Sequence, residues 1–154
     1  QGKFEYAVDT FEQMKETTRP DSITFLCVLT ACNHGGLMDR AQHYFESMNE
    51  YGVLSSVKHY NCMLDLLARA GRLQHALKLL KQMPFEPNHS TFNTILAACQ
   101  KWKDLEAAQE VFQYALWSDQ KHAGAFVLMS NIYADFDMWE ESQKIEEMRK
   151  QLAY

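Results

Sequence analysis

Apolar residues recur along most of the chain at intervals of three and four positions, whereas the alternation typical of a β-strand is weak. The segment Gly71–Met83, GRLQHALKLLKQM, shows this pattern, because Leu73, Ala76, Leu77 and Leu80 fall on one face of a helix. Similar segments begin at Gly2, GKFEYAVDTFEQM, and at Gly36, GLMDRAQHYFESM. Looser copies begin at Lys103 and Asp137. The pattern therefore predicts amphipathic helices that repeat every 32–35 residues.

A second helix is predicted ahead of each later copy. An aromatic residue near its start is followed three positions on by a large apolar residue, in the pairs Phe25 and Val28, Tyr60 and Met63, Phe92 and Ile95, and Phe126 and Met129. The two series keep the same spacing, which is the signature of tandem helix–turn–helix units. The predicted fold class is therefore all-α, a right-handed α-solenoid in which each pair of helices buries its apolar stripe against the next.

Repeat length alone leaves two families open. The tetratricopeptide repeat has a similar period, but its W-x₂-L-G-x₂-Y pattern occurs in none of these units. The chain instead resembles the pentatricopeptide repeat (PPR) family in the segments RPDSITFLCVLTACNHGGLMDRAQHYFESM, KHYNCMLDLLARAGRLQHALKLLKQMPFEPN and FVLMSNIYADFDMWEE. The order and spacing of HGGL, LLARAGRL, MPFEP and SNIYA are similar to those at the C-terminal end of plant organelle PPR proteins of the PLS subclass.

This resemblance implies five segments. Residues 1–21 are the second helix of a truncated P-type repeat, 22–56 an L-type repeat, 57–88 an S-type repeat, and 89–122 and 123–154 two E motifs. We expect an array of this kind to bind single-stranded RNA and to serve in C-to-U editing of an organelle transcript, in the chloroplast or the mitochondrion. The E motifs would position or recruit a cytidine deaminase, in cis or in trans, together with other editing factors.

In the family, each repeat is thought to contact one RNA base through the residue after the first aromatic and through the last residue of the repeat. For residues 57–88 these are Asn61 and Asn88. A carboxamide carries donors and an acceptor, which suits the Watson–Crick edge of an unstacked base. The family code implies that this pair favours a pyrimidine, C more than U. The alternative is that Asn61 is a solvated polar residue and Asn88 a helix cap.

The L-type pair, Leu26 and Ser56, departs from the family code. Leu26 cannot form a hydrogen bond with a base, so we expect little base recognition by this repeat.

Charge is divided unevenly along a chain whose net charge is −5. Residues 1–56 hold four basic and eight acidic residues, 57–88 hold five and two, and 89–154 hold six and ten. The single basic unit is therefore the one with the carboxamide pair, and a positive stripe is what the RNA backbone requires. We expect Lys58, Arg69 and Arg72 to contact phosphates. The overall acidity favours the rival function, a protein-binding scaffold of tetratricopeptide type.

Metal, catalytic and membrane functions find little support in the sequence. Cys32 and Cys99 occupy equivalent core-facing positions, no C-x₂-C pair is present, and no cofactor is expected. None of the six histidines is followed two positions later by glutamate, as the H-x-E motif of a zinc deaminase requires. No apolar run approaches the roughly 18 residues that span a membrane. The aromatic residues of the E motifs are expected to be mostly core, with a fraction forming an exposed surface for a partner; they are Tyr114, Trp117, Phe126, Tyr133, Phe136 and Trp139.

Overall fold

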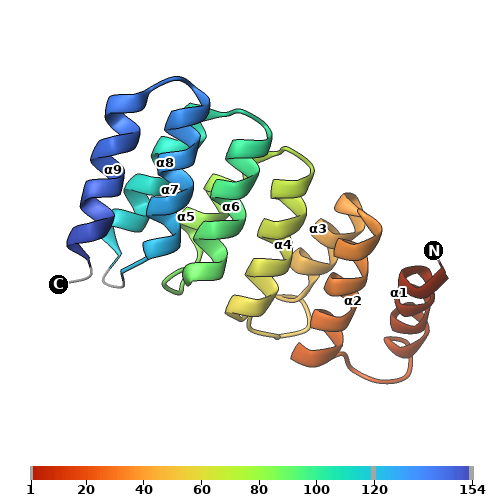
Figure 1. Ribbon diagram of the computed structural model, residues 1–154. Coiled ribbons are helices and arrows are strands. Elements are labelled where there is room, and N and C mark those ends of the chain that lie inside the picture. The colour runs from red at the N-terminus through yellow and green to blue at the C-terminus, as the bar shows by residue number, and fades with distance from the viewer. Residues whose placement is uncertain (1, 119–120, 153–154) are drawn as a thin grey trace. The chain divides into compact units, whose positions relative to one another are not determined.

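The computed structural model describes residues 2–118 and 121–152, and in that part of the chain it contains nine α-helices and no β-strand (Figure 1). The helices are α1 (Gly2–Met14), α2 (Ser22–Gly35), α3 (Met38–Ser47), α4 (Val57–Arg69), α5 (Leu73–Gln82), α6 (His89–Lys101), α7 (Leu105–Trp117), α8 (Ala123–Asp135) and α9 (Trp139–Gln151). The all-α prediction is confirmed. None of the described helices has both the length and the apolar character needed to cross a membrane.

The chain divides into two compact units, Gln1–Ala70 and Gly71–Tyr154. In the first unit, α2 packs against α1 and α3 and also against the next first helix, α4. In the second unit, α6 packs against α7 and against the next first helix, α8, which in turn packs against α9. Within each unit, successive hairpins therefore cover one another's apolar stripes, as the sequence period predicts.

The first helix of each hairpin has the same register. Its fourth residue is the aromatic residue of the repeat, and Phe25, Phe92 and Phe126 are at most 6% exposed. In α4 the corresponding Tyr60 is half-buried and packs against Phe45, with ring centroids 5.1 Å apart. The apolar residues three positions later, Val28, Met63, Ile95 and Met129, are at most 1% exposed, so the sequence pattern identified the core correctly.

The joint between the two helices of each hairpin passes through a left-handed backbone conformation. Gly36 and Gly71, which open the repeat motif, have φ angles of +66° and +75°. In the looser copies Lys103 and Asp137 occupy the same place, with φ angles of 54° and 60°. Glycine accepts this conformation without strain, whereas a residue with a Cβ loses about 1–2 kcal/mol. The turn therefore favours glycine, and the two units that carry Lys103 and Asp137 bear the strain of a Cβ at this place.

A buried histidine precedes α8. His122 is 2% exposed, and its Nε2 lies 3.1 Å from the Oγ of Ser118, which in turn donates a hydrogen bond to the Glu86 carboxylate. Because the Ser118 proton is used in this way, Nε2 of His122 is the donor and its Nδ1 is the acceptor. His89 therefore donates through its own Nδ1, at 2.6 Å. Burial lowers the pKa of His122, and the neighbouring His89 lowers it further.

We expect Lys103→Gly to stabilise the chain, because it removes the Cβ from a left-handed residue. The gain in the free energy of unfolding should be about 1 kcal/mol in urea denaturation. Lys103→Ala is the matched control, since it removes the charge but keeps the Cβ, and it should bring none of this gain. Gly71→Ala should destabilise the chain, because its Cβ would also lie 3.0 Å from the Trp102 ring. Equal stability of the glycine and alanine variants at residue 103 would contradict this account.

Stability should also depend on pH through His122. Its pKa in the folded chain lies below the ordinary value of 6.5, so the unfolded chain binds more protons at pH values between the two. The contribution of neutral His122 should therefore be complete above pH 6.5 and be lost as the pH falls below it. In thermal melts between about pH 8 and pH 5, His122→Gln should flatten this dependence, whereas His75→Gln, at an exposed site, should leave it intact. A slope that survives in His122→Gln would rule out this origin.

Candidate nucleic-acid interface

The residue that precedes each of the helices α2, α4, α6 and α8 occupies the last position of a predicted repeat. Asn88 holds this position before α6 and is exposed. Its Oδ1 accepts hydrogen bonds from the backbone N of Thr91 at 2.9 Å and from the Thr91 hydroxyl at 2.8 Å. The helix-cap interpretation of Asn88 is therefore confirmed. The cap uses the amide oxygen, and the amide nitrogen of the same exposed side chain carries two N–H donors.

Asn61 is the fifth residue of α4 and is half-buried. The next residue, Cys62, has its Sγ 3.6 Å from the Thr30 hydroxyl on α2, so this turn of α4 lies against α2. Asn61 belongs to the first compact unit and Asn88 to the second. The expectation that the two side chains approach one another stays a prediction.

The two residues of the L-type pair, Leu26 and Ser56, have contacts or burial within the protein. Leu26 is half-buried on α2. The Ser56 hydroxyl lies 2.7 Å from Nδ1 of His59, and the Ser56 backbone N donates to the same nitrogen at 3.0 Å. His59 is 1% exposed, and its Nε2 lies 2.9 Å from the carbonyl of Ser22. Since both ring nitrogens are occupied, His59 ties the start of α4 to the start of α2, a function that the sequence did not reveal.

The three predicted phosphate contacts differ in their surroundings. Lys58 and Arg72 are exposed, and in the part of the chain that the structure describes neither takes part in an ion pair. Arg69 instead donates to the carbonyl of Asn33 at 2.6 Å and to its Oδ1, and its Nε lies 3.5 Å from the Asp65 carboxylate. The positive charge of Arg69 is therefore partly neutralised where it stands.

Asn33 is the centre of a polar contact between α2 and α4. It is 8% exposed, and its Nδ2 donates to Asp65 at 2.8 Å. Sequence reasoning missed this cluster. A signal was present, because Asn33, Asp65 and Arg69 are 32 and 36 residues apart, about one repeat. Polar residues one repeat apart lie on adjacent hairpins and can pair when those hairpins stack.

The second unit offers a different set at the equivalent positions. Asn93 matches Asn61, but its Oδ1 is buried and has no hydrogen-bond partner among the described residues. A Cβ on Gly124 of α8 would lie 2.9 Å from the amide nitrogen of Asn93, so the carboxamide is packed beneath the first turn of α8. The next equivalent residue, Val127, is exposed and apolar. These residues present fewer hydrogen-bonding groups than Asn61 and Asn88.

The repeat pattern explains why two of the four cysteines are buried in the core. Cys32 and Cys99 are fully buried, as their equivalent positions predict, and burial raises their thiol pKa values to about 11 and about 12. Cys27 is exposed and Cys62 is half-buried. Over residues 2–118 and 121–152, no three side chains of the metal-binding types lie close enough together to hold an ion.

The aromatic residues of the last two units are less buried than we expected. Only Phe126 is buried, at 6% exposure; Tyr114 and Tyr133 are half-buried, and Trp117, Phe136 and Trp139 are exposed. The prediction that this set is mostly core is therefore wrong. The reason is position along the helix, because Trp117 ends α7 and Trp139 begins α9, where coverage by neighbouring helices is thinnest.

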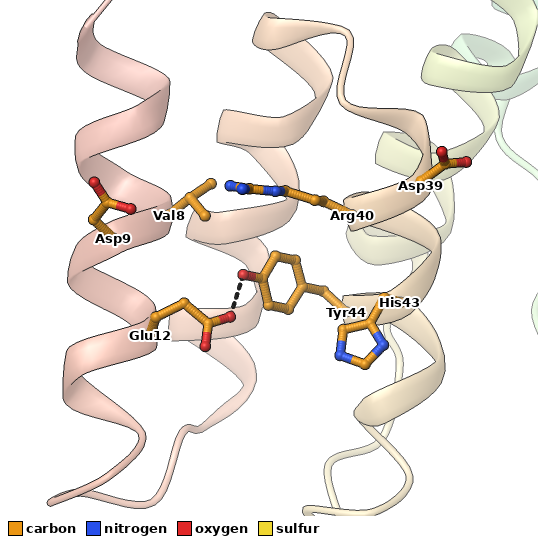
Figure 2. A pocket seen from close by; sticks show the side chains of 7 residues that line it. All are labelled: Val8, Asp9, Glu12, Asp39, Arg40, His43 and Tyr44. Carbon is orange, nitrogen blue, oxygen red and sulfur yellow. Dashed lines mark hydrogen bonds between the residues drawn. The ribbon is translucent and has the colours of Figure 1, made fainter.

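A pocket of about 370 Å³ lies between α1 and α3 in the first unit (Figure 2). Across it, Tyr44 donates a hydrogen bond of 2.5 Å to Glu12. Hydrogen bonds from Lys15 and Tyr44 lower the pKa of Glu12, whereas burial and the Glu12 carboxylate raise the pKa of Tyr44. Figure 2 shows Arg40 extending from α3 toward Val8. The pocket lies on second helices, and its central polar groups satisfy one another.

Two family models match the chain. The model described as "PPR repeat family" covers residues 55–101, and the one described as "PPR repeat" covers residues 23–53 and 90–116.

Curated relatives from Arabidopsis thaliana match nearly the whole chain. It is 40% identical over 153 residues to pentatricopeptide repeat-containing protein At2g44880, and 40% identical over 141 residues to pentatricopeptide repeat-containing protein At1g06140, mitochondrial. These alignments cover 99% and 90% of this chain but only 28% and 25% of the relatives. The chain therefore spans about a quarter of the length of these proteins.

Solved structures show the same fold. The pentatricopeptide repeat protein PPR10 from maize superimposes with a TM-score of 0.83 at 21% identity, covering 93% of this chain and 21% of that one. PPR10 in complex with an 18-nt psaJ RNA element gives a TM-score of 0.62 at 22% identity, covering 96% and 20%. This likeness confirms the predicted α-solenoid class. The two family models together match residues 23–53 and 55–116, more than half of the chain, which shows that the chain belongs to the pentatricopeptide repeat family.

Proposed function

We propose that this chain is a sequence-specific module for single-stranded RNA within an organelle C-to-U editing factor. The proposal includes the L-type repeat at 22–56, the S-type repeat at 57–88 and the two E motifs at 89–122 and 123–154. PPR10, a protein of the same fold, is known in complex with an RNA element, and several curated relatives are named mitochondrial. Either organelle, chloroplast or mitochondrion, is compatible with the proposal.

The observation that carries the proposal is the pair of carboxamides in the predicted S-type repeat. Asn88 is exposed and Asn61 is half-buried. At the places equivalent to Asn61, Leu26 and Val127 have no polar side-chain atoms, and the Oδ1 of Asn93 is buried. We assign to Asn61 and Asn88 the reading of one pyrimidine, since carboxamides match the polar edge of an unstacked base.

Backbone contacts are assigned to the exposed cations around this repeat. Lys58, on the first turn of α4, and Arg72, before α5, have no ion-pair partner among the described residues and are the main candidates. Arg69 contributes less, because a phosphate would compete with Asn33 and Asp65 for its guanidinium. These contacts add affinity without sequence preference.

The two E motifs are assigned a different partner. With six basic and ten acidic residues, residues 89–154 repel the phosphate backbone. We propose that they position or recruit the cytidine deaminase that carries out the editing step, in cis or in trans.

In the complete protein, Asn61→Thr should move the preference of this repeat from a pyrimidine toward a purine, as the family code implies. The change should be about 1 kcal/mol at one base, since the exchange concerns one neutral hydrogen bond. Binding is measured on RNAs that differ only at that base. Lys58→Ala is the control. It should lower the affinity for all four RNAs alike and reduce the salt dependence of binding. A uniform loss of affinity in Asn61→Thr would instead make the residue structural.

The role of the E motifs can be separated from RNA binding by charge reversal on α9. Glu140→Lys with Glu147→Lys, both at exposed sites, should not weaken RNA binding, because the change removes negative charge that repels phosphates. The extent of editing by the reconstituted complex should fall. Glu5→Lys with Asp9→Lys, both at exposed sites on α1, makes nearly the same change of charge and is the matched control; it should leave the extent of editing unchanged. Strengthened RNA binding with unchanged editing would contradict the assignment.

A further inference from the structure

A second pocket lies wholly within the second compact unit, where the segment after α5 meets the end of α7. Its volume is about 310 Å³, and three aromatic side chains, a proline, a serine and a carboxylate line it: Phe85, Glu86, Pro87, Tyr114, Trp117 and Ser118. Trp117 is 75% exposed and Phe85 is 39% exposed. No predicted RNA contact of the S-type repeat is among the lining residues.

The repeat provides an internal control for these aromatic residues. Phe85 and Trp117 stand at the same offset from the repeat glycine and its counterpart Lys103, and the two earlier units have Glu16 and Glu50 at that offset. Both glutamates are exposed, so the hairpin fold does not require an aromatic ring there. Large aromatic residues kept at a solvent-facing position of a repeat that accepts glutamate are typical of a binding surface.

The walls of the pocket are tied together. Ser118, at the end of α7, donates a hydrogen bond to the Glu86 carboxylate, and the same hydroxyl lies 3.1 Å from Nε2 of the buried His122. The carboxylate is therefore held beside the aromatic rings. A site that is ordered before its ligand arrives loses less entropy on binding.

We propose that this pocket binds an arginine side chain presented by a basic segment of a partner protein. A guanidinium is attracted to the faces of tryptophan and tyrosine and pairs with a carboxylate, and the pocket supplies both kinds of group. The second compact unit, residues 71–154, holds eleven acidic against nine basic residues, and this excess of negative charge adds attraction for a cation. A nucleic-acid base could stack on the same rings, but the surrounding charge repels its phosphates. The inference goes beyond RNA recognition and does not depend on it.

The test follows the indole N–H signals of the 154-residue chain by nuclear magnetic resonance, with the three tryptophans assigned by single Trp→Phe variants. The probe is a capped heptapeptide of alternating glycine and arginine. Its glutamate counterpart and oligouridylate are added in separate titrations. We expect a saturable shift of the Trp117 signal with the arginine peptide alone.

Two variants of equal charge separate the pocket from general electrostatics. Trp117→Glu installs the residue that earlier repeats carry, and Trp139→Glu adds the same charge at another exposed tryptophan, 64% exposed. Trp117→Glu should bind the arginine peptide with about tenfold lower affinity than Trp139→Glu, because the loss of the ring outweighs the added charge. Phe85→Glu should weaken it as well, and thermal melts verify that each variant folds.

The proposal is overturned if the arginine peptide gives no saturable shift, if the two tryptophan variants bind it equally, or if oligouridylate moves the Trp117 signal instead. The change of base preference in Asn61→Thr is measured in a separate experiment, so a negative result with the arginine peptide does not bear on the proposed RNA-binding function.

Discussion

The architecture depends on packing the aromatic ring one turn into each first helix against neighbouring helices. The Phe25 ring lies 5.2 Å from Phe11 and 5.6 Å from Tyr51, and the Phe92 ring lies 4.6 Å from His122. A single hairpin cannot enclose such a ring, so each hairpin relies on the neighbours before and after it. Two consequences follow, one for the orientation of each first helix and one for the residue that caps it.

The packed ring fixes the orientation of each first helix about its own axis. Successive residues of an α-helix are separated by about 100° around the axis, so fixing the fourth residue in the core places the fifth at the edge of the buried face. Leu26, Asn61, Asn93 and Val127 all stand at this fifth position, and it is the place that the family pattern assigns to base recognition. The same packing that stabilises the repeat therefore orients its candidate reading side chain.

The residue that precedes each first helix has two functions in the proposed RNA-binding array. Its side chain has to satisfy free backbone N–H groups at the start of a helix, and in the proposed function it also faces a base. Asn88 meets both demands, because its oxygen caps α6 while its nitrogen remains on an exposed side chain. Ser56 and His122 are taken up by contacts within the protein, to His59 and to His89 with Ser118 respectively. This division explains why one repeat stands out as the candidate reader.

The amino-acid sequence by itself determined the helical hairpins, their period and the buried apolar residue three positions after each aromatic residue. These features repeat, and each depends on local propensity and on the 3.6-residue period, which can be read along the chain. The structure alone decided which polar side chains meet across adjacent hairpins. Arg69 contacts Asn33 and Asp65, and His122 is buried beside His89, because partners about one repeat apart in sequence come together only when the hairpins stack.

Exposure at helix ends was likewise decided by the tertiary structure. Trp117 and Trp139 belong to the aromatic set of the last two units that we expected to be mostly core. Both are exposed, at 75% and 64%, because helix period gives the direction of a side chain but not whether a neighbour reaches far enough to cover it. Coverage depends on the lengths of the adjoining helices, and α5 stops before Pro84 whereas α7 continues to Trp117. Local periodicity thus determined the hairpins, and the stacking of unequal helices determined which side chains were left to bind a partner.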